Sequence, residues 1–265
     1  MPEAAVLGIA GSLLAGAMTG IGGLLVAAGG PPDERRQNLF MGFAAGVMIA
    51  AAFFSLIIPG VRQATLAGMA LAQAMVWMIA AVALGALILA QTRWAVERFA
   101  RRAAPPPPEF ALAAGDPHHR RVALFVLAIT LHNVPEGMAV GLSFMSGDPG
   151  LGWTTALAIG VQNVPEGMAV AAVLSTLGWN MTRCTLAALA TGLVEPLGGA
   201  LAVGIGQAST AALPWMLGLS AGAMLFVVMS EIIPATSRRI EHGSATPALL
   251  AGLAFMMVLD ISLGG

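Results

Sequence analysis

The sequence contains no lysine and no tyrosine, and it has a single cysteine among 265 residues. Because Cys184 has no second cysteine to pair with, a disulfide within the chain is excluded. Charged residues make up only 9% of the chain, against about 25% in soluble globular domains. The net charge of −1 gives no indication of nucleic-acid binding. With 58% hydrophobic residues, the composition indicates an all-α protein that crosses a membrane several times.

Eight apolar stretches are close to the length of about 20 residues that a helix needs to span a bilayer. The acidic start at Glu3 favours a first span that is retained rather than cleaved as a signal peptide. The expected spans are approximately 4–28, 38–60, 65–91, 122–145, 151–176, 183–207, 213–236 and 246–264.

The chain is predicted to form one membrane domain with a single long connection. Residues 1–97 carry the first three helices, and residues 122–265 carry the last five. Residues 98–121 form the linker between them, and the run from Pro105 to Pro108 favours flexible chain over a helix there.

Arginine predicts the orientation, because all twelve basic residues are arginines. Eleven of them flank the first, third, fifth and seventh connections, and only Arg62 lies on an even-numbered one. Basic residues accumulate on the cytoplasmic side of membrane proteins. The linker at 98–121 is therefore predicted to be cytoplasmic and both termini to be extracytoplasmic.

Two internal repeats are visible. Residues 132–140, HNVPEGMAV, return as QNVPEGMAV at 162–170, in the fourth and fifth spans. A weaker pair places AGVM and SLIIP in the second span, and AGAM and SEIIP in the seventh. The members of each pair run in opposite directions across the membrane. Similar sequence in opposed helices is typical of inverted-topology repeats in alternating-access transporters.

The repeated motif brings acidic and amide side chains to the middle of the membrane, where a charge costs several kcal/mol and needs a function. Residues three or four apart share a helix face, so His132 lies on the face of Glu136, and Gln162 on the face of Glu166. Since the two helices are antiparallel, we expect His132 level with Glu166, and Glu136 level with Gln162. No lysine or arginine lies near these acids in the sequence, so a mobile cation is the simplest partner.

A third acid, Glu195, lies in the sixth span and is followed by proline, like the other two. Imidazole together with carboxylate and amide oxygens suits a divalent transition metal better than sodium or potassium. Other roles stay open: Asn133 and Asn163 can also bond across helices. Met48 is one of sixteen methionines, so helix packing is its default role.

The paired motifs, with Glu-Pro in the sixth span, resemble the ZIP family of divalent metal transporters, in particular its bacterial GufA-type branch. The resemblance implies import of zinc, iron, manganese or cadmium into the cytosol, no cofactor beyond the transported ion, and the bacterial inner membrane as location. It also implies a 3+2+3 arrangement of eight helices. Spans one, four, five and six would form the moving bundle, and the others a scaffold that is often a homodimer.

The resemblance further implies two adjacent metal sites. The first corresponds to Met48, His132, Gln162 and Glu166, with Glu136 beside it, and the second to Asn133, Glu136, Asn163, Glu166 and Glu195. Some members of the family carry aspartate at the position of Asn163, so the amide here removes one charge from the second site.

Two other functions compete with metal transport as explanations of the buried acids. An intramembrane metalloprotease would require a His-Glu-x-x-His motif, which the sequence lacks. A proton-coupled carrier or channel for another cation would use the same glutamates as proton relays. Metal-dependent uptake separates the three.

Overall fold

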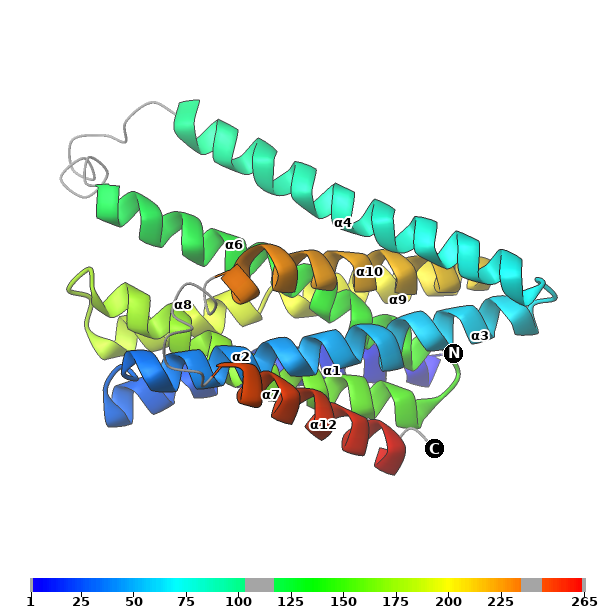
Figure 1. Cartoon of the computed structure of the whole chain (residues 1–265), viewed down its shortest axis with the longest axis horizontal. Coiled ribbons are helices and arrows are strands. Elements are labelled where there is room, and N and C mark those ends of the chain that lie inside the picture. The colour runs from blue at the N-terminus through cyan, green and yellow to red at the C-terminus, as the bar shows by residue number, and fades with distance from the viewer. Residues whose placement is uncertain (1, 103–116, 235–244, 264–265) are drawn as a thin grey trace.

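The computed structural model describes residues 2–102, 117–234 and 245–263, and these residues form helices joined by short turns, without strands. Its two ends lie on the same side of the molecule (Figure 1). The α-helices are α1 (Pro2–Gly29), α2 (Glu34–Ala51), α3 (Ile58–Leu66), α4 (Leu71–Arg102), α6 (Pro117–Met145), α7 (Pro149–Ser175), α8 (Met181–Gly192), α9 (Glu195–Ala208), α10 (Leu213–Val227) and α12 (Ala245–Leu263).

Eight stretches of the described chain are long and apolar enough to cross a membrane, and each overlaps one predicted span. The prediction of an all-α protein with eight spans is therefore confirmed. The third span begins later than predicted, at Leu71, because α3 continues through residue 66 and a turn follows with Gly68 at a positive φ of 96°.

Helices α4 and α6 extend into the two ends of the predicted linker, residues 98–121. Helix α4 continues through Arg102, and α6 already begins at Pro117. Alanine and arginine favour helix, which extends α4, and proline is well tolerated in the first turn where α6 starts. The rest of the predicted linker, with Pro105 to Pro108, lies outside the described residues.

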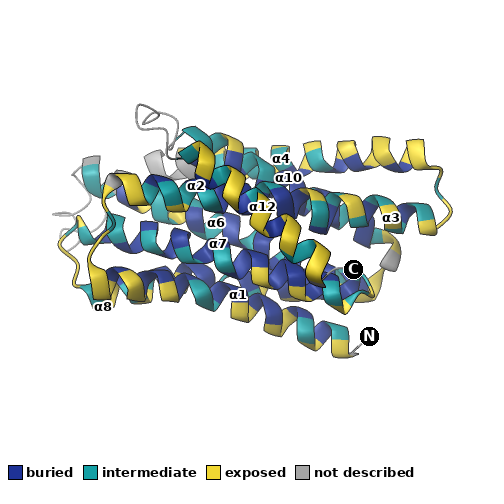
Figure 2. Cartoon of the chain, turned by 60° about the horizontal axis from the view of Figure 1, so that its bottom comes forward, coloured by how far each residue is buried: buried dark blue, intermediate teal, exposed yellow. Residues whose placement is uncertain are grey.

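The helices pack as two groups. The first group comprises α1, α6, α7, α8 and α9, and the second comprises α2, α3, α4, α10 and α12. Helix α7 lies at the centre of the molecule. Of its most apolar stretch of 18 residues, 72% are buried, and Figure 2 shows buried residues along most of the helix. The groups meet where α2 packs against α7 and where α10 packs against α6.

Glycine brings helix backbones together inside each group. A methyl group added at Gly137 of α6 would collide with the carbonyl oxygen of Glu195, and one at Gly167 of α7 with that of Thr19. In the second group, Gly222 of α10 is equally close to the carbonyl oxygen of Val82. Among the described glycines, the tightest contacts with a neighbouring backbone all join helices of one group. None of these close glycine contacts joins the two groups.

The weaker sequence repeat has a structural counterpart. The second and seventh spans each contain a short π-helix, η1 (Ala52–Ile57) and η3 (Val228–Ile232), and each π-helix includes the serine of its repeat, Ser55 or Ser230. A proline follows each serine by four residues. The two copies thus share an uncommon backbone conformation, which agrees with the predicted inverted repeat. The 3+2+3 arrangement itself remains a prediction.

Candidate metal centre

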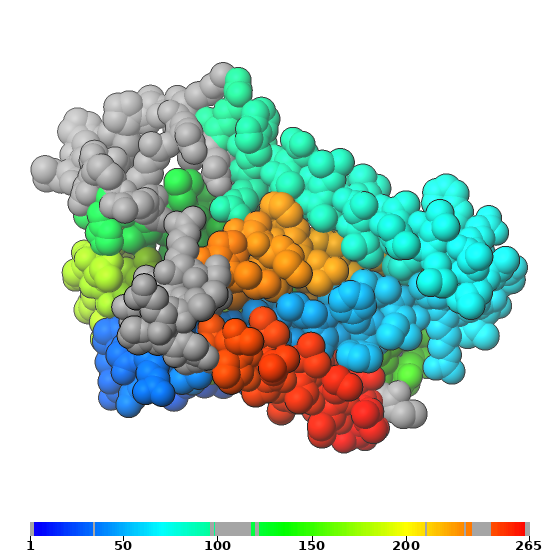
Figure 3. All heavy atoms as spheres, in the orientation of Figure 1, coloured from blue at the N-terminus to red at the C-terminus, as the bar shows by residue number. Residues whose placement is uncertain are grey.

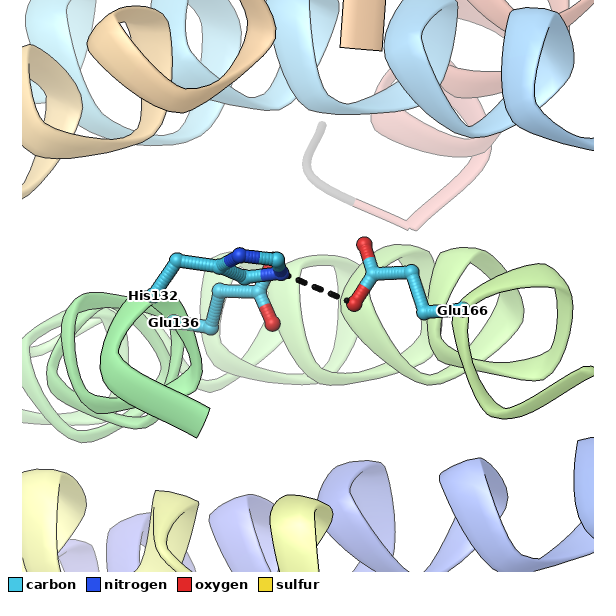
Figure 4. A group of neighbouring side chains, drawn as sticks. All are labelled: His132, Glu136 and Glu166. Atoms are coloured by element: carbon cyan, nitrogen blue, oxygen red, sulfur yellow. Dashed lines mark hydrogen bonds and ion pairs between the residues drawn. The ribbon is translucent and has the colours of Figure 1, made fainter. Parts of the chain in front are cut away.

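Helices α6 and α7 hold the repeated motif side by side at the same depth. His132 Nε2 lies 3.1 Å from Glu166 Oε2, and Gln162 Nε2 donates a hydrogen bond to Glu136 Oε1. Both contacts join the residues that the antiparallel register paired, so that prediction is confirmed. Figure 4 shows His132 and Glu136 on one helix and Glu166 on the other, with the three side chains turned toward one another.

His132, Glu136 and Glu166 form the group with the spacing of metal ligands. One ligating atom from each residue can be chosen so that all three lie within 4.8 Å of one another. Tetrahedral ligands about 2.0–2.1 Å from a zinc ion lie roughly 3.4 Å apart, close to the His132–Glu166 separation. The three side chains are at most 2% exposed, so water competes little for these atoms.

Asn163 and Glu195 lie beside this group. The Asn163 Nδ2 atom donates to Glu195 Oε1 at 2.6 Å and to the carbonyl oxygen of Ala15 at 2.9 Å. Asn133 Nδ2 donates to the carbonyl oxygen of Thr191 at 2.8 Å. Each amide therefore directs its nitrogen to the protein and keeps its oxygen for another partner.

Six side-chain oxygens of the predicted ligand set have no hydrogen-bond partner among the residues that the structure describes. All six residues are fully buried. Buried polar atoms are normally satisfied, and an unsatisfied one costs about 1–3 kcal/mol. The six atoms are all acceptors, a set that a cation would satisfy. They are Asn133 Oδ1, Glu136 Oε2, Gln162 Oε1, Asn163 Oδ1, Glu166 Oε1 and Glu195 Oε2.

Met48 is also fully buried, but in a different setting. It belongs to an apolar cluster with Ala45 of α2 and with Val227, Val228 and Ile232 at the end of the seventh span. Its role as a ligand therefore stays a prediction from the resemblance.

Two features of the site were not predicted from the sequence. The sixth span breaks between α8 and α9, at residues 193–194, so that Glu195 opens a new helix in mid-membrane. The sequence signals were Gly192 and Pro196, residues typical of helix ends and starts. Helix α1 also reaches the site through the Ala15 carbonyl, and the buried Thr19 Oγ1 has no hydrogen-bond partner in the described part of the chain.

Comparison with known proteins agrees with this geometry. The ZIP zinc transporter family matches over residues 113–260. The chain is 43% identical to zinc transporter ZIPB of Bordetella bronchiseptica over 98% of its own length and 81% of that protein. It is 38% identical to zinc transporter GufA of Myxococcus xanthus, over 97% of its own length and 99% of the relative. It also resembles human zinc transporter ZIP11, with 42% identity over 55% of this chain and 44% of that protein. The resemblance drawn from the motifs is thereby confirmed, and the chain belongs to the ZIP family.

Proposed function

We propose that this protein carries a divalent transition metal, zinc in the first place, through the site between α6 and α7. The observation that carries the proposal is the set of six buried acceptor oxygens without a hydrogen-bond partner among the described residues. Satisfying them separately would take several donors. One divalent cation satisfies several at once and also compensates two carboxylate charges.

The donor types favour zinc among divalent ions. Zinc binds imidazole nitrogen and carboxylate oxygen in tetrahedral sites, whereas magnesium and calcium prefer oxygen alone. The relatives are named as zinc transporters and not as enzymes, which argues against the protease alternative. Iron, manganese and cadmium remain alternative cargoes, because the same donors accept them.

We assign His132, Gln162, Glu166 and Met48 to a first ion, with Glu136 beside it. Glu136 and Glu166 also serve a second position, completed by Asn133, Asn163 and Glu195. The hydrogen bond between Asn163 and Glu195 supports this assignment, because it brings α7 and α9 together next to the first group.

We propose that the two helix groups shift relative to each other and that this shift moves the metal site. The first group contains every proposed ligand except Met48, and glycine contacts bind its helices closely together. The contact with the second group lacks such backbone contacts in the described chain, so the two groups can shift relative to each other. Such a shift would expose the site first to one side of the membrane and then to the other. We propose net import into the cytosol.

The arginine distribution and the bacterial relatives support a location in the inner membrane, with both termini extracytoplasmic. The second helix group is the proposed surface for a homodimer.

Zinc uptake into proteoliposomes tests the proposed function. The purified protein is reconstituted with a zinc indicator and a pH indicator inside the vesicles. We expect uptake by the parent protein and at least a tenfold lower rate for Glu166→Gln, since weaker perturbations around metal sites already cost about 10- to 100-fold. Asp33→Asn is the matched control, because Asp33 is an exposed acid that caps α2 away from the site. Proton flux without zinc uptake would favour the proton-coupled carrier and contradict the proposal.

A further inference from the structure

Helix α1 forms one wall of the metal centre, although the ligands assigned so far lie on α6, α7 and α9 and, for Met48, on α2. It packs against α6, α7, α8 and α9 within the first helix group. Figure 3 shows the face formed mainly by α2, α4, α10 and α12 of the second group, and Figure 2 shows α1 on the other side of α7. A polar side chain of α1 that points toward α7 and α8 can therefore approach the site from a direction that no assigned ligand covers.

Thr19 is such a side chain. It is fully buried, and its hydroxyl oxygen Oγ1 has no hydrogen-bond partner among the residues that the structure describes. A methyl group added at Gly192 would collide with this atom, so the hydroxyl lies against the last residue of α8. A methyl group at Gly167 of α7, the residue after Glu166, would collide with the carbonyl oxygen of Thr19. Thr19 therefore lies between the break in the sixth span and the helix that carries Glu166.

Two proposed ligands of the second ion contact α1 one helical turn before Thr19. A methyl group added at Gly16 would lie 3.3 Å from Cβ of Glu195. The carbonyl oxygen of Ala15 accepts a hydrogen bond from Asn163 at 2.9 Å, and Asn163 also donates to Glu195. Residues three or four apart share a face of a helix. Thr19 therefore lies on the face of α1 that contacts these two ligands.

The hydroxyl of Thr19 lacks the hydrogen bond that other threonines of this chain make within their own helix. Thr92 and Thr155 each donate to the carbonyl oxygen four residues earlier, at 2.9 and 2.8 Å. The equivalent acceptor for Thr19 is the carbonyl oxygen of Ala15. Its two lone pairs are already used by the helical N–H of Thr19 and by Asn163. A buried hydroxyl without a partner is destabilising, so we expect an ion or a water molecule at this oxygen.

We infer that Thr19 Oγ1 is a further ligand of the second metal ion, beside the oxygens of Asn163 and Glu195. The inference rests on the proposed function, because it adds a ligand to that site. With the five residues assigned above, the second position has six side chains that supply oxygen and none that supplies nitrogen or sulfur. Six oxygen donors suit manganese, whereas the imidazole of the first position suits zinc. The two positions therefore differ in the metal that they prefer.

Manganese binding to purified protein that already holds one equivalent of zinc tests the inference. Electron paramagnetic resonance measures the free manganese, and zinc K-edge absorption shows whether the first ion keeps its imidazole ligand. We expect the parent to bind one manganese ion and Thr19→Val to bind it at least tenfold more weakly, since perturbations around metal sites cost about 10- to 100-fold. Thr19→Ser keeps the hydroxyl and should bind like the parent.

Thr185→Val is the matched control. The hydroxyl of Thr185 also has no hydrogen-bond partner in the described part of the chain, but Thr185 lies against Gly23 of α1, away from the proposed ligands. This variant should bind manganese like the parent. Thermal unfolding without metal separates ligation from packing. Thr19→Val removes an unsatisfied hydroxyl and should be at least as stable as the parent, whereas a packing role alone predicts lower stability with unchanged manganese affinity.

A cysteine variant tests the contact with the ion directly and keeps the test decisive if Thr19→Val does not fold. Thr19→Cys, in a background with the buried Cys184 replaced by alanine, is loaded with two equivalents of zinc. We expect a zinc–sulfur distance of about 2.3 Å in its X-ray absorption. Thr185→Cys in the same background should not show this distance.

Four results would each overturn the inference. They are equal manganese affinity in the parent and Thr19→Val, a Thr19→Ser protein as weak as Thr19→Val, a parent that binds no ion beyond the first zinc, and a Thr19→Cys protein without the short zinc–sulfur distance. Each of them leaves the proposed function intact as long as the first zinc keeps its imidazole ligand. A parent protein that binds zinc without an imidazole would instead contradict the proposed function.

Discussion

The imidazole of His132 and the carboxylate of Glu166 meet at 3.1 Å between Nε2 and Oε2, although 34 positions separate them in the sequence. The contact follows from two antiparallel helices that carry the same motif, so the histidine of one copy faces the glutamate of the other. A metal ion bound there would take the place of the direct contact between these two side chains. This pair is the part of the site for which the sequence and the structure agree most directly.

Asn163→Asp should create a stronger second metal site. Asn163 now donates from Nδ2 to both Glu195 and the carbonyl oxygen of Ala15, and aspartate would lose both bonds and place a carboxylate beside Glu195. Without metal, we expect a loss of about 1–3 kcal/mol in the free energy of unfolding. With excess zinc, the bound metal measured by mass spectrometry should rise toward two ions per chain. Asn163→Ala is the control, since it loses the same bonds without adding charge. Equal stoichiometry in the aspartate variant and the parent would contradict the prediction.

Gly137→Ala should destabilise the first helix group. The added methyl would collide with the Glu195 carbonyl oxygen, a backbone atom that moves only if α9 shifts away from α6. Overpacking of this kind costs about 3 kcal/mol, seen as a lower temperature of thermal unfolding. Gly204→Ala is the matched control, because nothing lies within 4 Å of a methyl added at this helical position. That variant should gain about 0.5–1 kcal/mol. A Gly137→Ala protein as stable as the parent would show that the close approach of α6 and α9 is not needed.

Cysteine labelling tests the predicted orientation. In a background with the buried Cys184 replaced by alanine, Ala67→Cys places a thiol in the exposed turn between α3 and α4, and Pro31→Cys places one between α1 and α2. The arginine count predicts that an impermeant maleimide added outside intact cells labels position 67 and not position 31. The reverse pattern would require the opposite orientation.

The sequence was sufficient for the parts of the site that depend on helix periodicity. Eight spans, the facing of His132 with Glu166, and the place of Glu136 beside Gln162 all follow from apolar length, a 3.6-residue repeat and antiparallel direction. These are local properties of each segment, and the structure agrees with them.

Features that depend on backbone atoms or on tertiary packing were not predictable in the same way. The acceptor that Ala15 offers to Asn163 is a main-chain carbonyl, and an alanine in an apolar run gives no sign of it. The break before Glu195 and the π-helices around Ser55 and Ser230 arise within stretches that are continuously apolar, so hydropathy counts each as one unbroken span. The C-terminal end of α4 was missed because its last turns are rich in arginine. Arginine lowers the hydropathy, which is typical of a connection, but it has a high helix propensity.

Zinc K-edge X-ray absorption on the zinc-loaded protein tests the central claim most directly, namely that the pair of α6 and α7 binds the metal. We predict nitrogen and oxygen ligands at about 2.0–2.1 Å with the scattering of one imidazole. Met48, which we assign to the same ion, should add one sulfur scatterer at a longer distance. The imidazole signal should disappear in His132→Ala and persist when His118 and His119, at the start of α6, are both replaced by alanine. A signal that persists in His132→Ala and disappears in the double variant would place the zinc at the end of α6 and contradict the account.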